Sequence, residues 1–68
     1  MDQDLMIHMA NQIALFFASY PREEALAGVT DHFKKFWEPR MRKQIIEYVA
    51  HGGSGLHELA LEAVKHLQ

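Results

Sequence analysis

Hydrophobic residues recur at three- and four-residue spacing along most of the chain, and this spacing is typical of amphipathic α-helices. No segment alternates as a β-strand would, and no internal repeat is visible. Short breaks containing proline or glycine separate the helical segments. The pattern therefore predicts an all-α fold, a compact bundle of about four short helices joined by tight Pro/Gly turns.

The first segment is expected to run from about Asp4 to Ser19 and to bury one hydrophobic stripe. The predicted stripe consists of Leu5, Met9, Ile13, Phe16, Phe17 and Tyr20. Ile7 and Leu15 lie outside this stripe. A second contact surface would explain these two residues, although isolated exposed hydrophobic residues are common.

The stretch "SYPREE" predicts a break, after which Pro21 takes the first position of a second helix. Gly28 lies inside this helix, where glycine costs about 1 kcal/mol relative to alanine. We therefore expect a close helix–helix approach or a bend at Gly28. The inward-facing residues of this helix are predicted to be Leu26, Val29, Phe33, Phe36 and Trp37.

Proline and glycine also bound the remaining helices. Glu38 precedes a proline, so the second helix should end at about Trp37, and Pro39 can open the third. The two glycines at 52–53 predict the end of the third helix, and Ser54 is expected to cap the fourth. The expected inward-facing residues are Met41, Ile45, Tyr48 and Val49 on the third helix, and Leu56, Leu59, Ala60, Ala63, Val64 and Leu67 on the fourth.

Length and composition predict one small domain over residues 1–68. A chain of this size buries only about 60% of the surface that it exposes when unfolded. It has no cysteine, so neither a disulfide nor a thiolate-bound metal can support it, and a partner chain is a plausible support. We expect no signal peptide and no membrane-spanning helix, because no apolar run is long enough.

Charge is unevenly distributed along the chain. Residues 1–31 carry one basic against five acidic side chains (−4), residues 32–43 carry five against one (+4), and residues 44–68 carry one against three (−2). The sum is the net charge of −2. A basic segment between acidic ends argues against a general nucleic-acid binder, which is usually basic overall.

The basic segment contains the stretch "FKKFWEPRMR", residues 33–42, which is the strongest candidate for a binding site. Arg40, Arg42 and Lys43 open the third helix, where each cation loses roughly 0.3–1 kcal/mol against the helix dipole. The free backbone N–H groups of the same turn favour anions. An external carboxylate or phosphate would explain this placement, and the alternative is local neutralisation by Glu38 and nearby acids.

Other residues of this stretch have simpler explanations. Lys34 and Lys35 lie three and four residues after Asp31, which is a good spacing for an ion pair on a helix surface. We expect Phe33 and Phe36 to lie in the core and Trp37 to be shared between the core and an interface. The predicted partner-binding residues are Phe36, Trp37, Arg40, Arg42 and Lys43.

Nothing in the sequence predicts a catalytic, cofactor-binding or metal-binding residue. Neither Ser19 nor Ser54 lies in a nucleophile motif, and "GGSG" at 52–55 lacks the lysine of a phosphate-binding loop. The five histidines have no metal-ligand spacing such as HExxH. A chain this short cannot easily enclose a pocket of the usual few hundred Å³. We expect the chain not to be an enzyme by itself.

Several motifs in order resemble a known family. These are "MANQIALFF" at 9–17, "YP" at 20–21, "HFKKFWEPRMR" at 32–42 and "GGSGL" at 52–56. Together they resemble the small delta subunit of cytoplasmic, NAD-dependent, molybdenum-containing formate dehydrogenases, over roughly residues 5–67.

The resemblance implies a non-catalytic accessory subunit in a complex that oxidises formate to CO2. The alpha (catalytic) subunit of that complex would hold bis-molybdopterin guanine dinucleotide and iron–sulfur clusters, and the beta and gamma subunits would use FMN, clusters and NAD. The delta chain would bind no cofactor itself. It would dock on the alpha subunit and support assembly, cofactor insertion or stability.

Two other functions are compatible with the residues. The first is a free-standing helical protein–protein interaction module, for which a homodimer is one form, with Ile7 and Leu15 as its supporting feature. The second is a helix-turn-helix nucleic-acid binder that reads with Arg40, Arg42, Lys43 and Gln44. The acidic flanks disfavour the second, because a DNA-binding protein needs many phosphate contacts.

Overall fold

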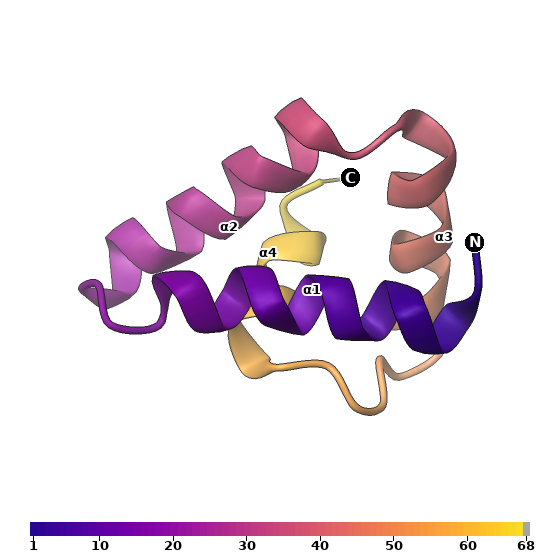
Figure 1. Ribbon diagram of the computed structural model, residues 1–68, viewed down its shortest axis with the longest axis horizontal. Coiled ribbons are helices and arrows are strands. Elements are labelled where there is room, and N and C mark those ends of the chain that lie inside the picture. Colours follow the sequence, from indigo (N-terminus) through magenta and orange to yellow (C-terminus); the bar gives the residue numbers. More distant parts are fainter. Residues whose placement is uncertain (68) are drawn as a thin grey trace.

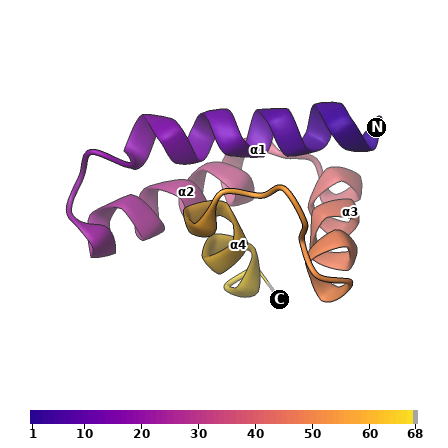
Figure 2. The same ribbon diagram turned by 90° about the horizontal axis from the view of Figure 1, so that it is seen from below.

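The computed structural model describes residues 1–67, which contain four helices and no strand. They are α1 (Gln3–Phe17), α2 (Arg22–Phe36), α3 (Pro39–Ala50) and α4 (Glu58–Lys65). Helix α1 runs the length of the molecule, with α2 along its C-terminal half and α3 beside its N-terminal end (Figure 1). Helix α4 packs among the other three (Figure 2). The predicted all-α class is confirmed.

The predicted buried stripe of α1 is correct in part. Its members Met9, Ile13 and Phe17 are partly buried against the core, whereas Leu5, Phe16 and Tyr20 are exposed. The fully buried residues of α1 are Met6, Ala10 and Ala14, so the buried face is rotated about the helix axis from the predicted one. Ile7, expected to point away from the core, is partly buried against it. The stripe follows the alanines because small side chains let α1 approach its neighbours closely. Helix α1 carries hydrophobic residues on all of its faces, so periodicity alone cannot identify the face that is buried.

Helices α1 and α2 approach each other closely at Gly28, as its place inside a helix predicted. A Cβ added at Gly28 would lie 2.5 Å from Cε1 of Phe17, well inside van der Waals contact. The aromatic ring of Phe17 therefore occupies the space that any other residue at position 28 would fill.

The core is built around α4, whose predicted inward face is confirmed. Ala60, Ala63 and Val64 are fully buried, and Leu59 nearly so. The core also contains Ala25, Val29, Phe33 and Trp37 from α2 and its C-cap, Ile45 from α3, and Leu56 from the α3–α4 loop. On α3, the other predicted inward residues Met41, Tyr48 and Val49 are partly buried.

The α3–α4 loop ends α3 at its glycines as expected, with Gly52 and Gly53 at φ of +116° and +65°. The prediction that Ser54 caps α4 is wrong. His57 is the cap, and its Nδ1 accepts a hydrogen bond from the backbone N–H of Leu59 at 3.0 Å. The helix starts later because the chain first inserts Leu56 into the core.

Candidate functional site: the α2–α3 corner and the aromatic surface beside it

The corner between α2 and α3 has the predicted boundaries. Helix α2 ends at Phe36, Trp37 is extended at φ −88° and ψ 133°, and Pro39 opens α3. This extended turn directs the Trp37 indole into the core, where it is 4% exposed and its ring centroid lies 4.6 Å from that of Phe33. Because the indole is almost fully buried, Trp37 offers almost no accessible surface for the partner contact that we expected of it.

Arg42 has a structural partner within the corner. Its Nη1 donates to the carbonyl oxygen of Trp37, and to that of Lys34 at 3.2 Å. These carbonyls lie at the C-terminal end of α2, where the helix dipole favours a cation. The cation that is unfavourably placed in the first turn of α3 is therefore favourably placed at the end of α2. The position of Arg42 is therefore explained by the C-terminal end of α2 rather than by an external anion.

Arg40 and Lys43 differ from Arg42. Both are exposed, and within residues 1–67 neither makes an ion pair or a side-chain hydrogen bond. The predicted surface pair does form, since Lys35 Nζ lies 2.9 Å from Oδ2 of Asp31. Lys34 has no ion-pair partner in the described part of the chain. The corner therefore retains three cations without a partner there.

Phe36 is the clearest disagreement with the predicted core. Its side chain is 71% exposed, and its ring rests against the ring of His32 with 4.8 Å between centroids. The reason is positional: α2 buries Phe33 and then Trp37 beyond its end, and Phe36 lies beside this row. An aromatic side chain predicted to stabilise the core is instead available at the surface next to the cationic corner.

A groove between α1 and α2 extends the apolar surface away from the corner. Gln12, Ile13, Phe16 and Phe17 of α1 line it together with His32 of α2. Phe16 is 67% exposed and packs edge-on against Phe17 at 5.0 Å. We call Ile13, Phe16, Phe17, His32 and Phe36 the aromatic surface.

Sequence reasoning missed this surface, although the chain carries a signal for it. No Asp, Glu, Lys or Arg occurs from Leu5 to Pro21. A helix with one solvated face normally carries charges there. Their absence from all of α1 after Asp4 indicates that its outer face is apolar or neutral as well.

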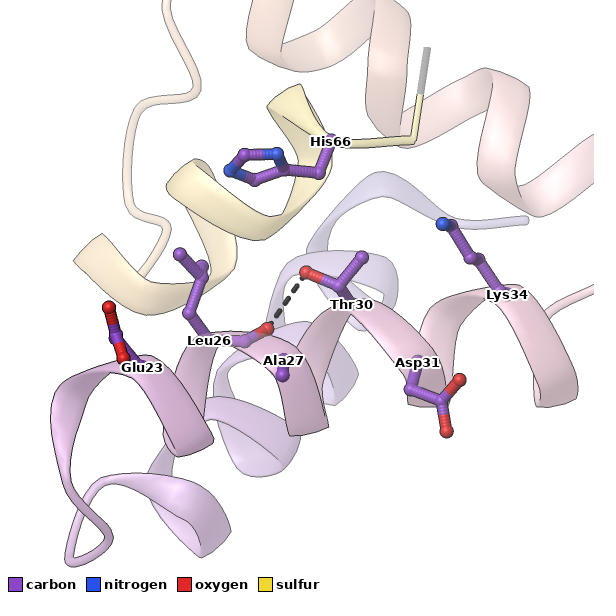
Figure 3. A pocket seen from close by; sticks show the side chains of 7 residues that line it. All are labelled: Glu23, Leu26, Ala27, Thr30, Asp31, Lys34 and His66. Carbon is purple, nitrogen blue, oxygen red and sulfur yellow. Dashed lines mark hydrogen bonds between the residues drawn. The ribbon is translucent and has the colours of Figure 1, made fainter.

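A second hollow, of about 480 Å³, lies between α2 and the end of α4 (Figure 3). It is shallow and open, with His66 above it and Glu23, Leu26, Thr30 and Lys34 along α2. Its side chains mix both charge signs, and Thr30 Oγ1 is already bonded to the Leu26 carbonyl at 2.8 Å. Among residues 1–67 no three His, Asp or Glu side chains gather as metal ligands, and no helix is long and apolar enough to span a membrane.

An exposed ion pair joins the starts of α2 and α4. Both guanidinium nitrogens Nη1 and Nη2 of Arg22 donate to the two carboxylate oxygens of Glu58. These hydrogen bonds, and secondarily the charge of Arg22, lower the pKa of the Glu58 carboxyl below its ordinary value of 4.5. The same hydrogen bonds raise the pKa of the Arg22 guanidinium. The pair fixes the two helices at the end of the molecule opposite the cationic corner.

The fold and site define a small all-α protein with an exposed aromatic surface next to cations that have no ion-pair partner within residues 1–67. The profile of the family described as NADH-dependant formate dehydrogenase delta subunit FdsD matches residues 5–64. The chain therefore belongs to this family of formate dehydrogenase delta subunits. Searches of curated proteins and of solved structures give no significant match.

Proposed function

We propose that the chain is a non-catalytic accessory subunit of a cytoplasmic, NAD-dependent formate dehydrogenase, and that it docks on the catalytic alpha subunit. Family membership supports a place in this complex. The observation that carries the docking proposal is the 71% exposure of Phe36, directly beside the corner that holds Arg40. Aromatic residues, phenylalanine included, and arginine are enriched in protein–protein interfaces relative to the rest of the surface.

The five residues predicted for partner binding divide into two roles in this proposal. Phe36 would lose its exposed area against the alpha subunit, and Arg40 and Lys43 would pair with carboxylates there or with phosphates of the incoming molybdenum cofactor. Trp37 and Arg42 would act from within the chain. Trp37 anchors the corner in the core, and Arg42 holds the end of α2 against the start of α3.

The effect on formate oxidation would be indirect. The alpha subunit would carry out the chemistry with its own molybdenum cofactor, and this chain would contribute binding energy. A subunit that binds the folded, assembled enzyme more tightly than its separate parts shifts the equilibrium toward assembly by mass action. Support of cofactor insertion or of stability follows from the same equilibrium.

Co-purification tests the proposal. The alpha subunit is expected to retain wild-type chain, to lose most of it with the Phe36→Ala/Arg40→Ala/Lys43→Ala variant, and to retain a Lys65→Ala control. Molybdenum content and formate-dependent reduction of NAD would fall together with binding. Undiminished retention and full molybdenum content with the triple variant would refute docking through this corner.

A homodimeric interaction module is the alternative function. Leu15 still supports it with 57% exposure, whereas Ile7 does not, because it packs against the core. Light scattering of the isolated chain at several concentrations separates the two functions. A concentration-independent dimer with no affinity for the alpha subunit would favour the module.

A further inference from the structure

We infer that the groove between α1 and α2 receives an apolar segment of the catalytic subunit whose end nearest the α2–α3 corner carries carboxylates. This inference rests on the proposed docking function and specifies the partner chemistry for it. It concerns α1 and the groove, which the predicted set of partner-binding residues does not include.

The groove has the form that a helix or an extended apolar segment can occupy. On the α1 side, the lining residues Gln12 and Phe16 are four apart, a spacing that forms a ridge along an α-helix. On the α2 side, His32 lines the groove, and Gly28 lies four residues before it in the same row. Gly28 lowers the α2 ridge where the ring of Phe17 crosses it. The hollow between the ridges has a volume of about 360 Å³ and an almost wholly apolar lining.

The charge pattern restricts what can bind over α1. The chain has no formally charged side chain from Leu5 to Pro21, so a ligand's charge facing α1 would be desolvated without a partner. The occupant must therefore present uncharged, apolar side chains to the groove. A nucleic acid does not meet this condition, because its backbone charges would lie against a neutral helix.

The corner adds the second requirement. Residues 32–43 carry a net charge of +4, and Arg40 and Lys43 have no ion-pair partner within residues 1–67. Phe36 connects this corner to the groove through its contact with His32. An occupant that follows the groove reaches the corner, where carboxylates would neutralise these cations.

A second copy of the chain fits these requirements less well. A two-fold interface places the same patch on both subunits. Contact between the α1 helices of two copies would cover the apolar residues. The cations of the α2–α3 corner would then meet acids of the other copy only if the acidic first turns of its α1 or α2 lay against that corner. A different chain with an apolar segment that ends in carboxylates satisfies both regions at once.

The absence of native cysteine makes a site-specific test direct. A Gln12→Cys chain carrying a benzophenone maleimide is incorporated into the co-expressed formate dehydrogenase complex and irradiated, with Lys65→Cys at the end of α4 as the matched control. A carbodiimide, which joins lysine to adjacent carboxylates, is applied to the unlabelled complex. We expect Gln12→Cys, and not Lys65→Cys, to join an apolar peptide of the catalytic subunit, and Lys43 to join an Asp or Glu adjoining that peptide.

Each other outcome overturns the inference. One such outcome is a crosslink from Gln12→Cys to a second copy of this chain. Another is a crosslink from Gln12→Cys to an apolar peptide of the catalytic subunit when the carbodiimide joins Lys43 to no carboxylate near that peptide. The last is an assembled complex in which Gln12→Cys forms no crosslink. The last leaves the proposed docking function intact, whereas failure of the unmodified chain to enter the complex contradicts the docking function itself.

Affinity provides an independent readout. Phe16→Ala should weaken binding to the catalytic subunit at least tenfold, while Leu15→Ala, an equally simple truncation of a neighbouring exposed residue outside the groove lining, should change it less than twofold. Because both side chains are already largely exposed, circular dichroism should show unchanged folding for both variants. Equal effects of the two variants would overturn the inference.

Discussion

The side chain of Asn11 on α1 holds the backbone of His57 at the start of α4. Asn11 Oδ1 accepts a hydrogen bond from the His57 N–H at 2.7 Å, and Asn11 Nδ2 donates to the carbonyl of Gly55 at 2.9 Å. Two stretches that carry the family resemblance, "MANQIALFF" and "GGSGL", are thus joined by one amide. The amide fixes the loop that places Leu56 in the core and His57 at the cap of α4.

Replacing Asn11 should therefore destabilise the fold at a distance from the candidate site. Asn11→Ala leaves the His57 N–H without its partner in a partly buried position, and we expect a loss of about 1–3 kcal/mol in the free energy of unfolding. Asn11→Asp keeps the acceptor but not the donor, and should lose less. Urea denaturation followed by circular dichroism measures both, and equal stability of wild type and Asn11→Ala would contradict this account.

Gly28 offers a test in which the expected sign is opposite to the usual rule. In a helix interior, Gly→Ala normally stabilises by about 1 kcal/mol. Here the new methyl group would overlap the ring of Phe17, so Gly28→Ala should destabilise the chain. Phe17→Leu, although destabilising alone, should remove most of the additional penalty, which a double-mutant cycle of thermal or urea unfolding measures. A stabilising Gly28→Ala would refute the close approach.

The sequence predicts those features that depend on the residues at the position itself, and it fails where contacts between distant residues decide the structure. Pro39 and the glycines at 52–53 determine the backbone at their own positions, so the helix ends they mark could be predicted to within a residue. The cap of α4 could not, because His57 becomes the cap only after Asn11, far away in the sequence, holds the loop. Tertiary contacts decided that boundary.

The same distinction applies to the candidate site. The stretch around Arg40 could be singled out from its composition, but Phe36 and Phe33 are both hydrophobic and only packing assigns one to the surface. Arg42 was expected to meet an external anion because its own helix disfavours it. Its actual partners are carbonyls of the preceding helix, and helical periodicity contains no information about such contacts across a turn.

The two arginines of the corner should separate stability from binding. Arg42→Ala removes the donor to the carbonyls at the end of α2, and we expect it to lower the free energy of unfolding by about 1–2 kcal/mol. Arg40→Ala removes an exposed side chain and should change stability by less than about 0.5 kcal/mol. Urea unfolding of both variants and of Arg42→Lys checks this assignment. Equal stabilities of Arg40→Ala and Arg42→Ala would show that the Arg42 contacts do not hold the corner.

The ion pair of Arg22 and Glu58 predicts a specific pH dependence of stability. Because the hydrogen bonds from Arg22 lower the Glu58 pKa in the folded state, folding favours the ionised carboxyl. This contribution is present above the ordinary pKa of 4.5 and is lost as the pH falls below it and the folded carboxyl takes up its proton. Arg22 stays charged throughout this range, so Glu58 is the group of the pair that titrates.

Glu58→Gln should therefore be less stable than wild type near neutral pH, and the difference should shrink as the pH falls from 4.5 through the lowered pKa of Glu58. Urea unfolding at a series of pH values measures it. Added salt should shrink the difference at neutral pH as well, because the pair is exposed and screened by ions. Glu47→Gln is the matched control, since Glu47 is an exposed acid on α3 with no ion-pair partner within residues 1–67. A Glu58→Gln difference that is independent of pH between neutrality and pH 3 would mean that the pair does not form in solution.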